Sequence, residues 1–203
     1  WAIPILRPLL GSGFVVGIYF GLFRSSYLLF VVNGLHLQPD AVGGVIAVGG
    51  IAALVGGALT ERFSRALGVG RSIAIGLVFV GLGLVLVPAA AALPAAGLLL
   101  LVSHQLLSDG FETVWEANQG AIRGRVVPAA YQGRANAAFD GLGIVGRLLG
   151  IVVGGAVGTS AAGSGAALLL GGAAAMLVGL GIAASRLGAI RSVGELEVGS
   201  PAS

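Results

Sequence analysis

One stretch decides the fold of this chain: residues 105–158 read QLLSDGFETVWEANQGAIRGRVVPAAYQGRANAAFDGLGIVGRLLGIVVGGAVG. It consists of two apolar runs joined by a basic segment, with Asp109 and Glu112 in the first run and Asp140 and Arg147 in the second. A charged side chain at mid-bilayer costs about 2.5–3.5 kcal/mol on insertion scales, so such residues normally face a bundle interior or a wet cavity. The stretch therefore predicts a membrane-helix hairpin with a polar inner face.

The composition of the chain excludes an ordinary water-soluble fold. Of its 203 residues, 57% are hydrophobic and 9% are charged, whereas soluble domains carry about 25% charged residues. The long apolar runs also disfavour an outer-membrane barrel, whose strands alternate in polarity over about ten residues. The sequence has no cysteine and only two histidines, so it offers no disulfide and no metal site, and we expect no cofactor.

Six segments have about the 20 apolar residues that a helix needs to cross the hydrocarbon. We place them at 9–32, 41–60, 72–92, 95–117, 135–157 and 165–185. The expected fold is an all-α membrane protein, with a cytoplasmic lead-in at 1–8 and a six-helix transmembrane bundle at 9–185. Residues 186–203 are expected to form a disordered cytoplasmic tail.

The arginines predict the orientation of the bundle. All nine arginines outside the predicted spans fall on one side of this topology, and the loops on the other side, 33–40, 93–94 and 158–164, contain none. The nine are Arg7, Arg62, Arg65, Arg71, Arg123, Arg125, Arg134, Arg186 and Arg191. Arginine-rich loops stay in the cytoplasm, so we expect a multi-pass protein of the cell (inner) membrane with both termini cytoplasmic. The arginines lie in short loops between the apolar segments and do not form a surface of arginine and aromatic side chains, so we expect no nucleic-acid partner.

The segments differ in their polarity. The third and the sixth carry no charged residue, which predicts that they face lipid. The first, fourth and fifth carry charges and must face something else. Glycines recur every four residues in the first segment (13, 17, 21) and in the fifth (146, 150, 154, 158). Small residues at this interval let helix backbones approach closely, so we expect tight packing there, with a hinge as the alternative.

Three stretches carry a family resemblance. Residues 57–65 read GALTERFSR and match a Gly-x-Leu-Ala-Asp-Arg-x-Gly-Arg signature, with Glu61 for Asp and Ser64 for Gly. Residues 34–43 read GLHLQPDAVG, and the run from Asn118 to Gly155 contains GRANA at 133–137. Together they resemble the second six of twelve helices in drug-efflux members of the major facilitator superfamily. The sequence departs from the pattern of that family at two positions. Asp140 stands where relatives often carry a basic residue, and Arg147 adds a charge in the middle of its segment.

The resemblance implies a secondary active transporter and not an enzyme. It implies proton-coupled efflux of a small amphipathic compound by alternating access, with an N-terminal six-helix half or a second copy as partner in the lipid bilayer. The helices equivalent to the first and fourth segments would line the central cavity. A cytoplasmic gate would include Gly57, Glu61, Arg62, Arg65, Arg123, Arg134 and Arg147.

The fourth segment carries a polar stripe. At 100° per residue, Gln105, Asp109, Glu112 and Glu116 fall within about 60° of arc. We expect Asp109 and Glu112 to share the cytoplasmic third of the membrane with Asp140. Carboxyls in such surroundings are candidates for carrying the coupling proton. The alternative is a latch, in which they pair with the arginines of the fifth segment or of the loops.

Three further residues are candidates for the substrate cavity. Arg24 lies in the first segment, and His104 and Gln105 lie in the fourth. Arg24 would bind a polar substrate group or pair with an acid of the missing half. His104 would be either a relay or a packed, hydrogen-bonded side chain.

Other functions fit the sequence less well. A transport-dead half that serves as a membrane scaffold or assembly partner stays open as the alternative. An intramembrane serine protease is disfavoured, because Ser164 falls in an outer loop and neither histidine is suitably placed. No P-loop is present, so direct drive by ATP is unsupported and an ion gradient is the expected energy source.

Overall fold

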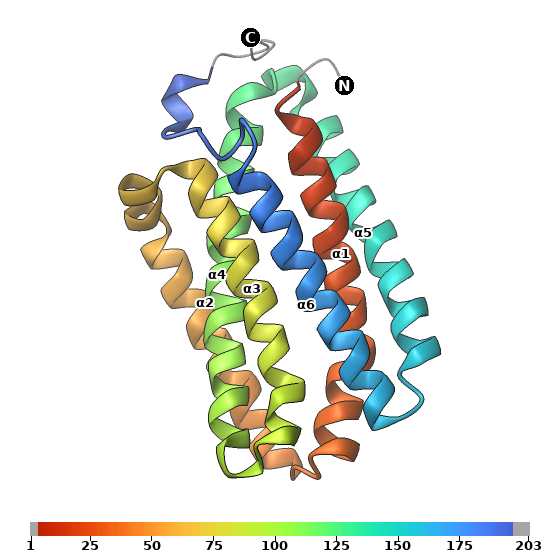
Figure 1. Cartoon of the computed structure of the whole chain (residues 1–203). Coiled ribbons are helices and arrows are strands. Elements are labelled where there is room, and N and C mark those ends of the chain that lie inside the picture. The colour runs from red at the N-terminus through yellow and green to blue at the C-terminus, as the bar shows by residue number, and fades with distance from the viewer. Residues whose placement is uncertain (1–3, 197–203) are drawn as a thin grey trace.

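Every regular element that residues 4–196 form in this computed structural model is a helix, and these are the residues that the structure describes. The long helices are α1 (Leu6–Leu29), α2 (Pro39–Leu67), α3 (Val69–Ala92), α4 (Gly97–Val126), α5 (Gln132–Val157) and α6 (Ala161–Ala183). A π-helical turn, η1 (Phe30–Gly34), extends α1, and three short 3-10 helices are η2 (Pro94–Ala96), η3 (Ala129–Tyr131) and η4 (Val193–Glu195). The long helices form one bundle in which successive helices run in opposite directions (Figure 1).

Five of these helices are long and apolar enough to cross a membrane, as judged by length and composition: α1, α2, α3, α5 and α6. This is the pattern of a multi-pass membrane protein, in agreement with the all-α membrane class predicted from the sequence. α4 has 30 residues but is not among the five, because charged and polar residues interrupt its apolar run. Hydropathy therefore supports five spans in the described part of the chain.

Two helices extend beyond their predicted ends. α2 continues to Leu67 through residues that we expected in a loop, and α4 continues to Val126. Hydropathy marks where a helix leaves lipid, whereas the helix itself persists into water until a residue breaks it. At α2 that residue is Gly68, whose φ of 93° lies in the left-handed region that glycine adopts without steric cost. α3 then begins at once, at Val69.

The main helix contacts have an internal symmetry. α1 packs against α5 as α4 packs against α2, and α3 packs against α4 as α6 packs against α1. α3 and α6 pack against each other. Exchanging α1–α3 with α4–α6 therefore leaves the contact pattern unchanged. Because α1 and α4 run in opposite directions (Figure 1), the two triplets are related as an inverted repeat.

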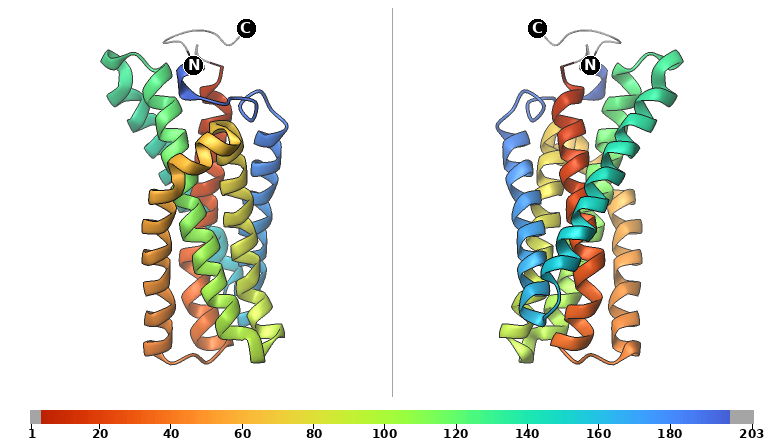
Figure 2. Two further views of the ribbon diagram at one scale, coloured as in Figure 1. Left: turned by 90° about the vertical axis from the view of Figure 1, so that its left-hand side faces the viewer. Right: turned by 90° about the vertical axis from the view of Figure 1, so that its right-hand side faces the viewer.

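One end of the bundle collects the arginine-bearing segments. α1, α3 and α5 begin there and α2, α4 and α6 finish there, at the end where both termini lie (Figure 1). We call it the arginine end. The turn between α4 and α5 leans outward from it, and α5 crosses α1 obliquely (Figure 2). Which end faces the cytoplasm stays a prediction, because the structure contains no membrane.

The chain after α6 folds back over the arginine end. Of the expected tail 186–203, the structure describes 186–196. Leu187 is buried, and the backbone N–H groups of Val69 and Gly70 donate to the carbonyl oxygens of Arg191 and Ile190. This described part is thus packed onto α3, whereas residues 197–203, like 1–3, lie outside the described residues.

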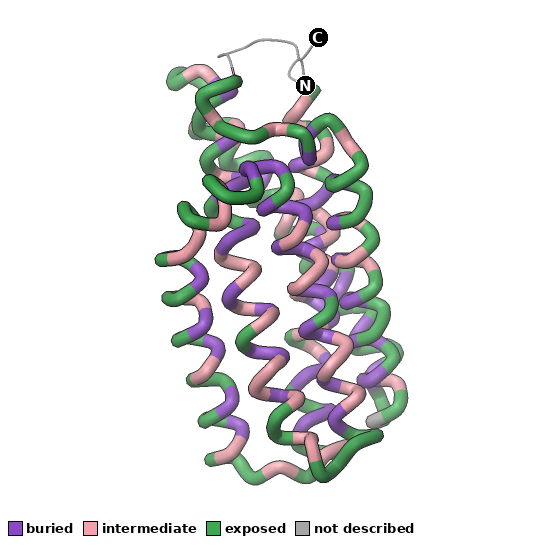
Figure 3. Tube along the Cα trace, turned by 60° about the vertical axis from the view of Figure 1, so that its left-hand side comes forward, coloured by how far each residue is buried: buried purple, intermediate pink, exposed green. Residues whose placement is uncertain are grey.

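Burial within the bundle differs from the expectation for α3, which contains one of the two segments predicted to face lipid. Buried and exposed positions alternate along the helices (Figure 3). Among the five apolar helices α3 is the most buried inside the chain, and α2 and α5 are the least buried. α3 therefore packs mainly against protein, where lipid was expected. An apolar helix surface suits protein and lipid equally, so composition alone cannot distinguish the two neighbours.

The glycine spacing marks a close helix crossing, as expected. A Cβ added at Gly17 or Gly21 on α1 would overlap backbone atoms of α5. One added at Gly146 or Gly150 on α5 would overlap carbonyl oxygens of α1. Of the other predicted glycines, Gly13 has open space around its Cβ position, a Cβ at Gly154 would meet the Ser25 hydroxyl of α1, and one at Gly158 would meet the Gly154 carbonyl of its own segment. The α1–α5 contact thus depends on four glycines, and it fixes the position of the site described next.

Candidate functional site

Two hollows flank the polar face of α4. The first, which we call the α4–α5 hollow, has a volume of about 400 Å³ and is lined by α1, α4 and α5. The second, the α2–α4 hollow, has a volume of about 570 Å³ and is lined by α1, α2 and α4. Glu112 and Glu116 line both. The stripe predicted from helical periodicity therefore forms the wall between them.

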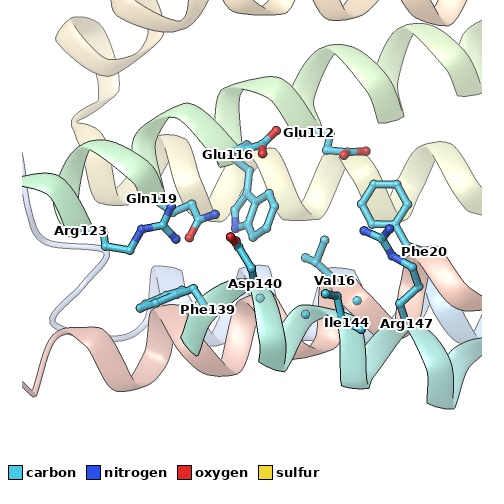
Figure 4. A pocket seen from close by; sticks show the side chains of 14 residues that line it. Val16, Phe20, Glu112, Glu116, Gln119, Arg123, Phe139, Asp140, Ile144 and Arg147 are labelled. Atoms are coloured by element: carbon cyan, nitrogen blue, oxygen red, sulfur yellow. The ribbon is translucent and has the colours of Figure 1, made fainter. Parts of the chain in front are cut away.

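The α4–α5 hollow has a charged lining. Glu112 and Glu116 reach it from α4, and Asp140 reaches it from α5 (Figure 4). The Arg123 guanidinium lies 4.7 Å from the centre of the Phe139 ring, and that of Arg147 lies 5.4 Å from the centre of the Phe20 ring. These are cation–π distances, so both cations are held against aromatic faces at the edges of the hollow.

Two buried polar atoms in the α4–α5 hollow have no partner in the described protein. They are Nε1 of Trp115, a donor, and Oε1 of Gln119, an acceptor. The two residues are 6% and 8% exposed, and both line the hollow. A buried polar group without a hydrogen bond is costly, so the hollow is suited to hold water or a polar ligand.

The α2–α4 hollow is lined by aromatic residues and glycines as well as acids. Phe23 and Tyr27 contribute from α1, Gly49 from α2, and Gln105 and Asp109 from α4. The Tyr27 hydroxyl and the Gln105 Oε1 atom are buried and unpartnered within the described residues. This hollow combines apolar walls with a few polar groups, as small-molecule sites do.

The internal symmetry relates the two hollows. Exchanging α1 with α4 and α2 with α5 turns the helix set α1, α2, α4 into α4, α5, α1. The hollows are thus equivalent positions of the inverted repeat with different side chains. In transporters built from inverted repeats, binding sites lie at the interface of the repeats.

The structure brings the three predicted acids together only in pairs. Glu112 shares one hollow with Asp109 and the other with Asp140. Asp109 and Asp140 line different hollows. Among the described residues, the ion pair within 4 Å is Glu61–Arg65 alone, so the direct pairing of these acids with Arg147 or with the loop arginines that a latch requires is not seen in this conformation.

The three substrate-cavity candidates have different surroundings. Gln105 lines the α2–α4 hollow. His104 is buried, its Nδ1 lies 3.1 Å from the Ser108 hydroxyl, and its ring packs against Phe23 and Tyr27. These contacts match the packed, hydrogen-bonded reading, although Nε2 has no partner among the described residues. Arg24 is exposed and lines neither hollow.

The predicted gate residues lie at the arginine end of α2, α4 and α5, apart from Arg147 farther along α5. Glu61 and Arg65 form a 2.9 Å ion pair one turn apart on the exposed surface, which contributes little to stability. A partly buried polar contact joins α2 to α4: the Ser64 hydroxyl lies 2.7 Å from Oδ1 of Asn118, to which it can donate. The same hydroxyl lies 2.8 Å from the Thr60 carbonyl oxygen of its own helix.

The remaining gate residues have two kinds of surroundings. Gly57 and Arg62 are exposed, and Arg134 lies over the nearby Tyr131 ring at 4.7 Å. Arg123 and Arg147 join helices through the cation–π contacts given above, α4 to α5 and α5 to α1 respectively.

Sequence reasoning missed Tyr27, Trp115 and Gln119, and it placed Glu116 on the polar stripe without giving it a role. Gln119 falls on the same helical face as Glu112 and Glu116, so extending the stripe by one turn would have included it. The aromatic residues of α1 recur at 19, 23 and 27, a spacing that signals one helix face. Nothing in the sequence distinguished Trp115 from a packed core residue.

The site offers carboxylates, amides and aromatic faces but no metal-binding cluster. Among residues 4–196, no three His, Asp or Glu side chains are grouped to hold a metal ion. Comparison of the chain with protein-family models, with curated proteins and with solved structures gives no match.

Proposed function

We propose that this chain is one six-helix half of a secondary active transporter of the major facilitator type. It exports a small amphipathic compound in exchange for protons by alternating access. In this proposal α4 also crosses the membrane, which brings the number of spans to six. Its charged face is turned to the two hollows, and its other faces pack against α3 and α2. The arginine end lies in the cytoplasm, because basic loops are retained there.

The observation that carries the proposal is the acidic face of α4 between two hollows that the internal symmetry exchanges. Inverted repeats with a site at their interface are the architecture of secondary transporters. Ionisable residues in such a position mark substrate and proton pathways. Unpaired carboxylates and buried Tyr, Trp and Gln atoms without hydrogen bonds cost free energy. A purely structural role would not compensate for this cost.

The exposed surfaces support a requirement for a partner. α2 and α5 are the least buried of the apolar helices, and the lining of both hollows includes exposed residues such as Glu116 and Asp140. A second six-helix body, either an N-terminal half or a second copy, would cover these surfaces. It would also convert the open hollows into a closed cavity.

Uphill transport in proteoliposomes tests the proposal. The chain is reconstituted alone and with a co-expressed six-helix half, a pH gradient is imposed, and accumulation of amphipathic dyes such as rhodamine 6G is followed. Accumulation that a protonophore abolishes is the expected result. A folded, correctly inserted complex that never accumulates dye above equilibrium would favour a scaffold role instead.

A further inference from the structure

The two hollows occupy equivalent positions in the repeat, yet their linings differ in kind. Five charged side chains line the α4–α5 hollow: Glu112, Glu116 and Arg123 from α4, and Asp140 and Arg147 from α5. The lining from α1 adds no charged group. In the α2–α4 hollow, the charged groups are Asp109, Glu112 and Glu116, and the rest of the wall is aromatic, aliphatic or glycine with one amide, of Gln105, and two hydroxyls, of Tyr27 and Thr113.

The charged hollow also opens toward the arginine end. Arg123 lies in the last turn of α4 and lines this hollow, so the hollow begins where α4 leaves the bundle. From there Gln119, Glu116 and Glu112 follow one another along the face of α4 (Figure 4). Water needs two to four polar partners to occupy a cavity, and the three carboxylates and two guanidiniums of the lining provide them. Trp115 and Gln119, which also line the hollow, each have a buried polar atom without a partner among the described residues.

The other hollow lies farther from the arginine end. Tyr27 is one turn from the end of α1, and Gly49 and Gly50 are in the first half of α2. Gly50 has open space beside it, whereas Gly49 lies against the side chains of Asp109 and Gln105. Aromatic and aliphatic walls beside an acidic face suit an amphipathic organic molecule better than a chain of water.

We infer that the hollows divide the work of the proposed transporter, on which this inference rests. The α4–α5 hollow is a water-filled route that connects Glu112 with the arginine end. The α2–α4 hollow binds the organic cargo. Glu112 takes a proton from water when alternating access opens the site to the opposite side. After the change of state its carboxyl gives that proton to a water molecule in the α4–α5 hollow, which leaves a carboxylate and a hydrated proton at the arginine end. Glu112 and Glu116 line both hollows, but Glu116 is exposed and Glu112 is half-buried, so Glu112 is the acid that couples them.

Cysteine accessibility tests this division directly, because the natural chain has no cysteine. Three glycines form a matched set in which a new side chain has room. Gly143 lines the α4–α5 hollow, Gly50 lines the α2–α4 hollow, and Gly155 lies on the exposed surface of α5 away from both. Each is changed to cysteine in the full chain and treated in sealed vesicles with a small cationic methanethiosulfonate.

The reagent reacts with thiolate, which forms only in a hydrated site. Gly143→Cys should react about tenfold or more faster than Gly155→Cys, and only from the arginine-end side. Rhodamine 6G should slow the reaction of Gly50→Cys and leave that of Gly143→Cys unchanged. Equal rates for Gly143→Cys and Gly155→Cys would overturn the water route. Protection of Gly143→Cys by the dye, or none at Gly50→Cys, would overturn the cargo assignment.

A spectroscopic measurement supplies an independent check on the wet hollow. In a Trp1→Phe background, Trp115 is the only tryptophan of the chain. If its N–H group contacts water, exchange into deuterium oxide should increase its fluorescence, and Gln119→Leu should diminish that increase. If the fluorescence intensity of Trp115 were the same in water and in deuterium oxide, the inference would be contradicted. Vesicles that give the expected accessibility pattern but no uphill transport would retain the division of the hollows and reject only the transporter proposal.

Discussion

Gly49 on α2 lies against the carboxylate of Asp109 on α4, so closely that a methyl group at Gly49 would overlap an Asp109 carboxylate oxygen. The same methyl group would come 2.7 Å from Nε2 of Gln105. Both obstacles are the ends of flexible side chains and neither is backbone. The glycine therefore places the two polar side chains in the hollow without being required for the helix crossing itself.

Gly49→Ala should separate function from stability. Alanine is a better helix former than glycine, and Asp109 and Gln105 can rotate away, so the melting temperature in detergent should stay close to that of the unchanged chain. Uphill dye accumulation by the complete transporter should fall, because the acid has moved. Gly44→Ala on the same helix, which has open space and lines neither hollow, is the matched control and should preserve both. Equal activity of the two variants would mean that the Asp109 position does not matter.

Gly146→Ala and Gly150→Ala should act in the opposite way. Their new methyl groups would meet the carbonyl oxygens of Phe14 and Ile18, and backbone cannot rotate away. Overpacking of this kind typically costs about 1–3 kcal/mol, so thermal unfolding should shift to lower temperature. Gly155→Ala on the same helix faces open space and should not destabilise. If all three variants melted alike, the α1–α5 crossing would not depend on its glycines.

The sequence predicted the helices because lipid imposes a simple demand, about 20 apolar residues for each crossing. It did not predict that α2 extends to Leu67 or α4 to Val126, because in water the apolar signal disappears while the helix persists. The π-helical turn after α1 gave no periodic signal either.

The site was predictable only along α4. Periodicity placed Gln105, Asp109 and Glu112 on one face, because that depends on the geometry of a single helix. The separation of Asp109 from Asp140 into different hollows, and the exposure of Arg24, depend on the rotation and neighbours of several helices. These are set by long-range packing, about which local sequence carries little information.

Single cysteines should establish the orientation. Gln38 and Thr159 are exposed at the end opposite the arginines, and Ser192 is exposed at the arginine end. With the arginine end in the cytoplasm, Gln38→Cys and Thr159→Cys should react with an impermeant maleimide on intact cells, whereas Ser192→Cys should react only after permeabilisation. Thr159 is chosen over Ser160, whose hydroxyl accepts from the Gly163 N–H and caps α6. Labelling of Ser192→Cys on intact cells would reverse the topology.

The hydrogen bond between Ser64 and Asn118 should matter more than the neighbouring ion pair. It is partly buried and joins two helices, whereas Glu61 and Arg65 are exposed and lie on one helix. Asn118→Ala should lower the free energy of unfolding by about 1–2 kcal/mol, because it removes the interhelical hydrogen bond and the Asn118 bond to the Val114 carbonyl. Glu61→Gln should change it by less than about 0.5 kcal/mol. If Glu61→Gln destabilised the protein more than Asn118→Ala, the surface ion pair would contribute more to stability than the hydrogen bond between the helices.

Glu112 should be the acid on which coupling depends, because it is the carboxylate of the predicted set that lines both hollows. Glu112→Gln keeps the size and hydrogen-bonding capacity of the side chain but cannot take up a proton. Uphill accumulation driven by a pH gradient should therefore be lost, while counterflow exchange of labelled for unlabelled dye, which moves no net proton, should persist. The measurement requires the complete transporter in liposomes, with both assays made on the same preparation.

Asp109→Asn and Asp140→Asn should affect transport differently, because each acid lines a different hollow. Asp109 lines only the α2–α4 hollow, so its loss should weaken dye binding and reduce counterflow as well as uphill accumulation. Asp140 lines only the α4–α5 hollow, so its loss should slow uphill accumulation while counterflow continues at its normal rate. If Glu112→Gln accumulated dye normally while Asp109→Asn failed in uphill transport alone, the proton would bind at Asp109 and the shared wall would not be the coupling point.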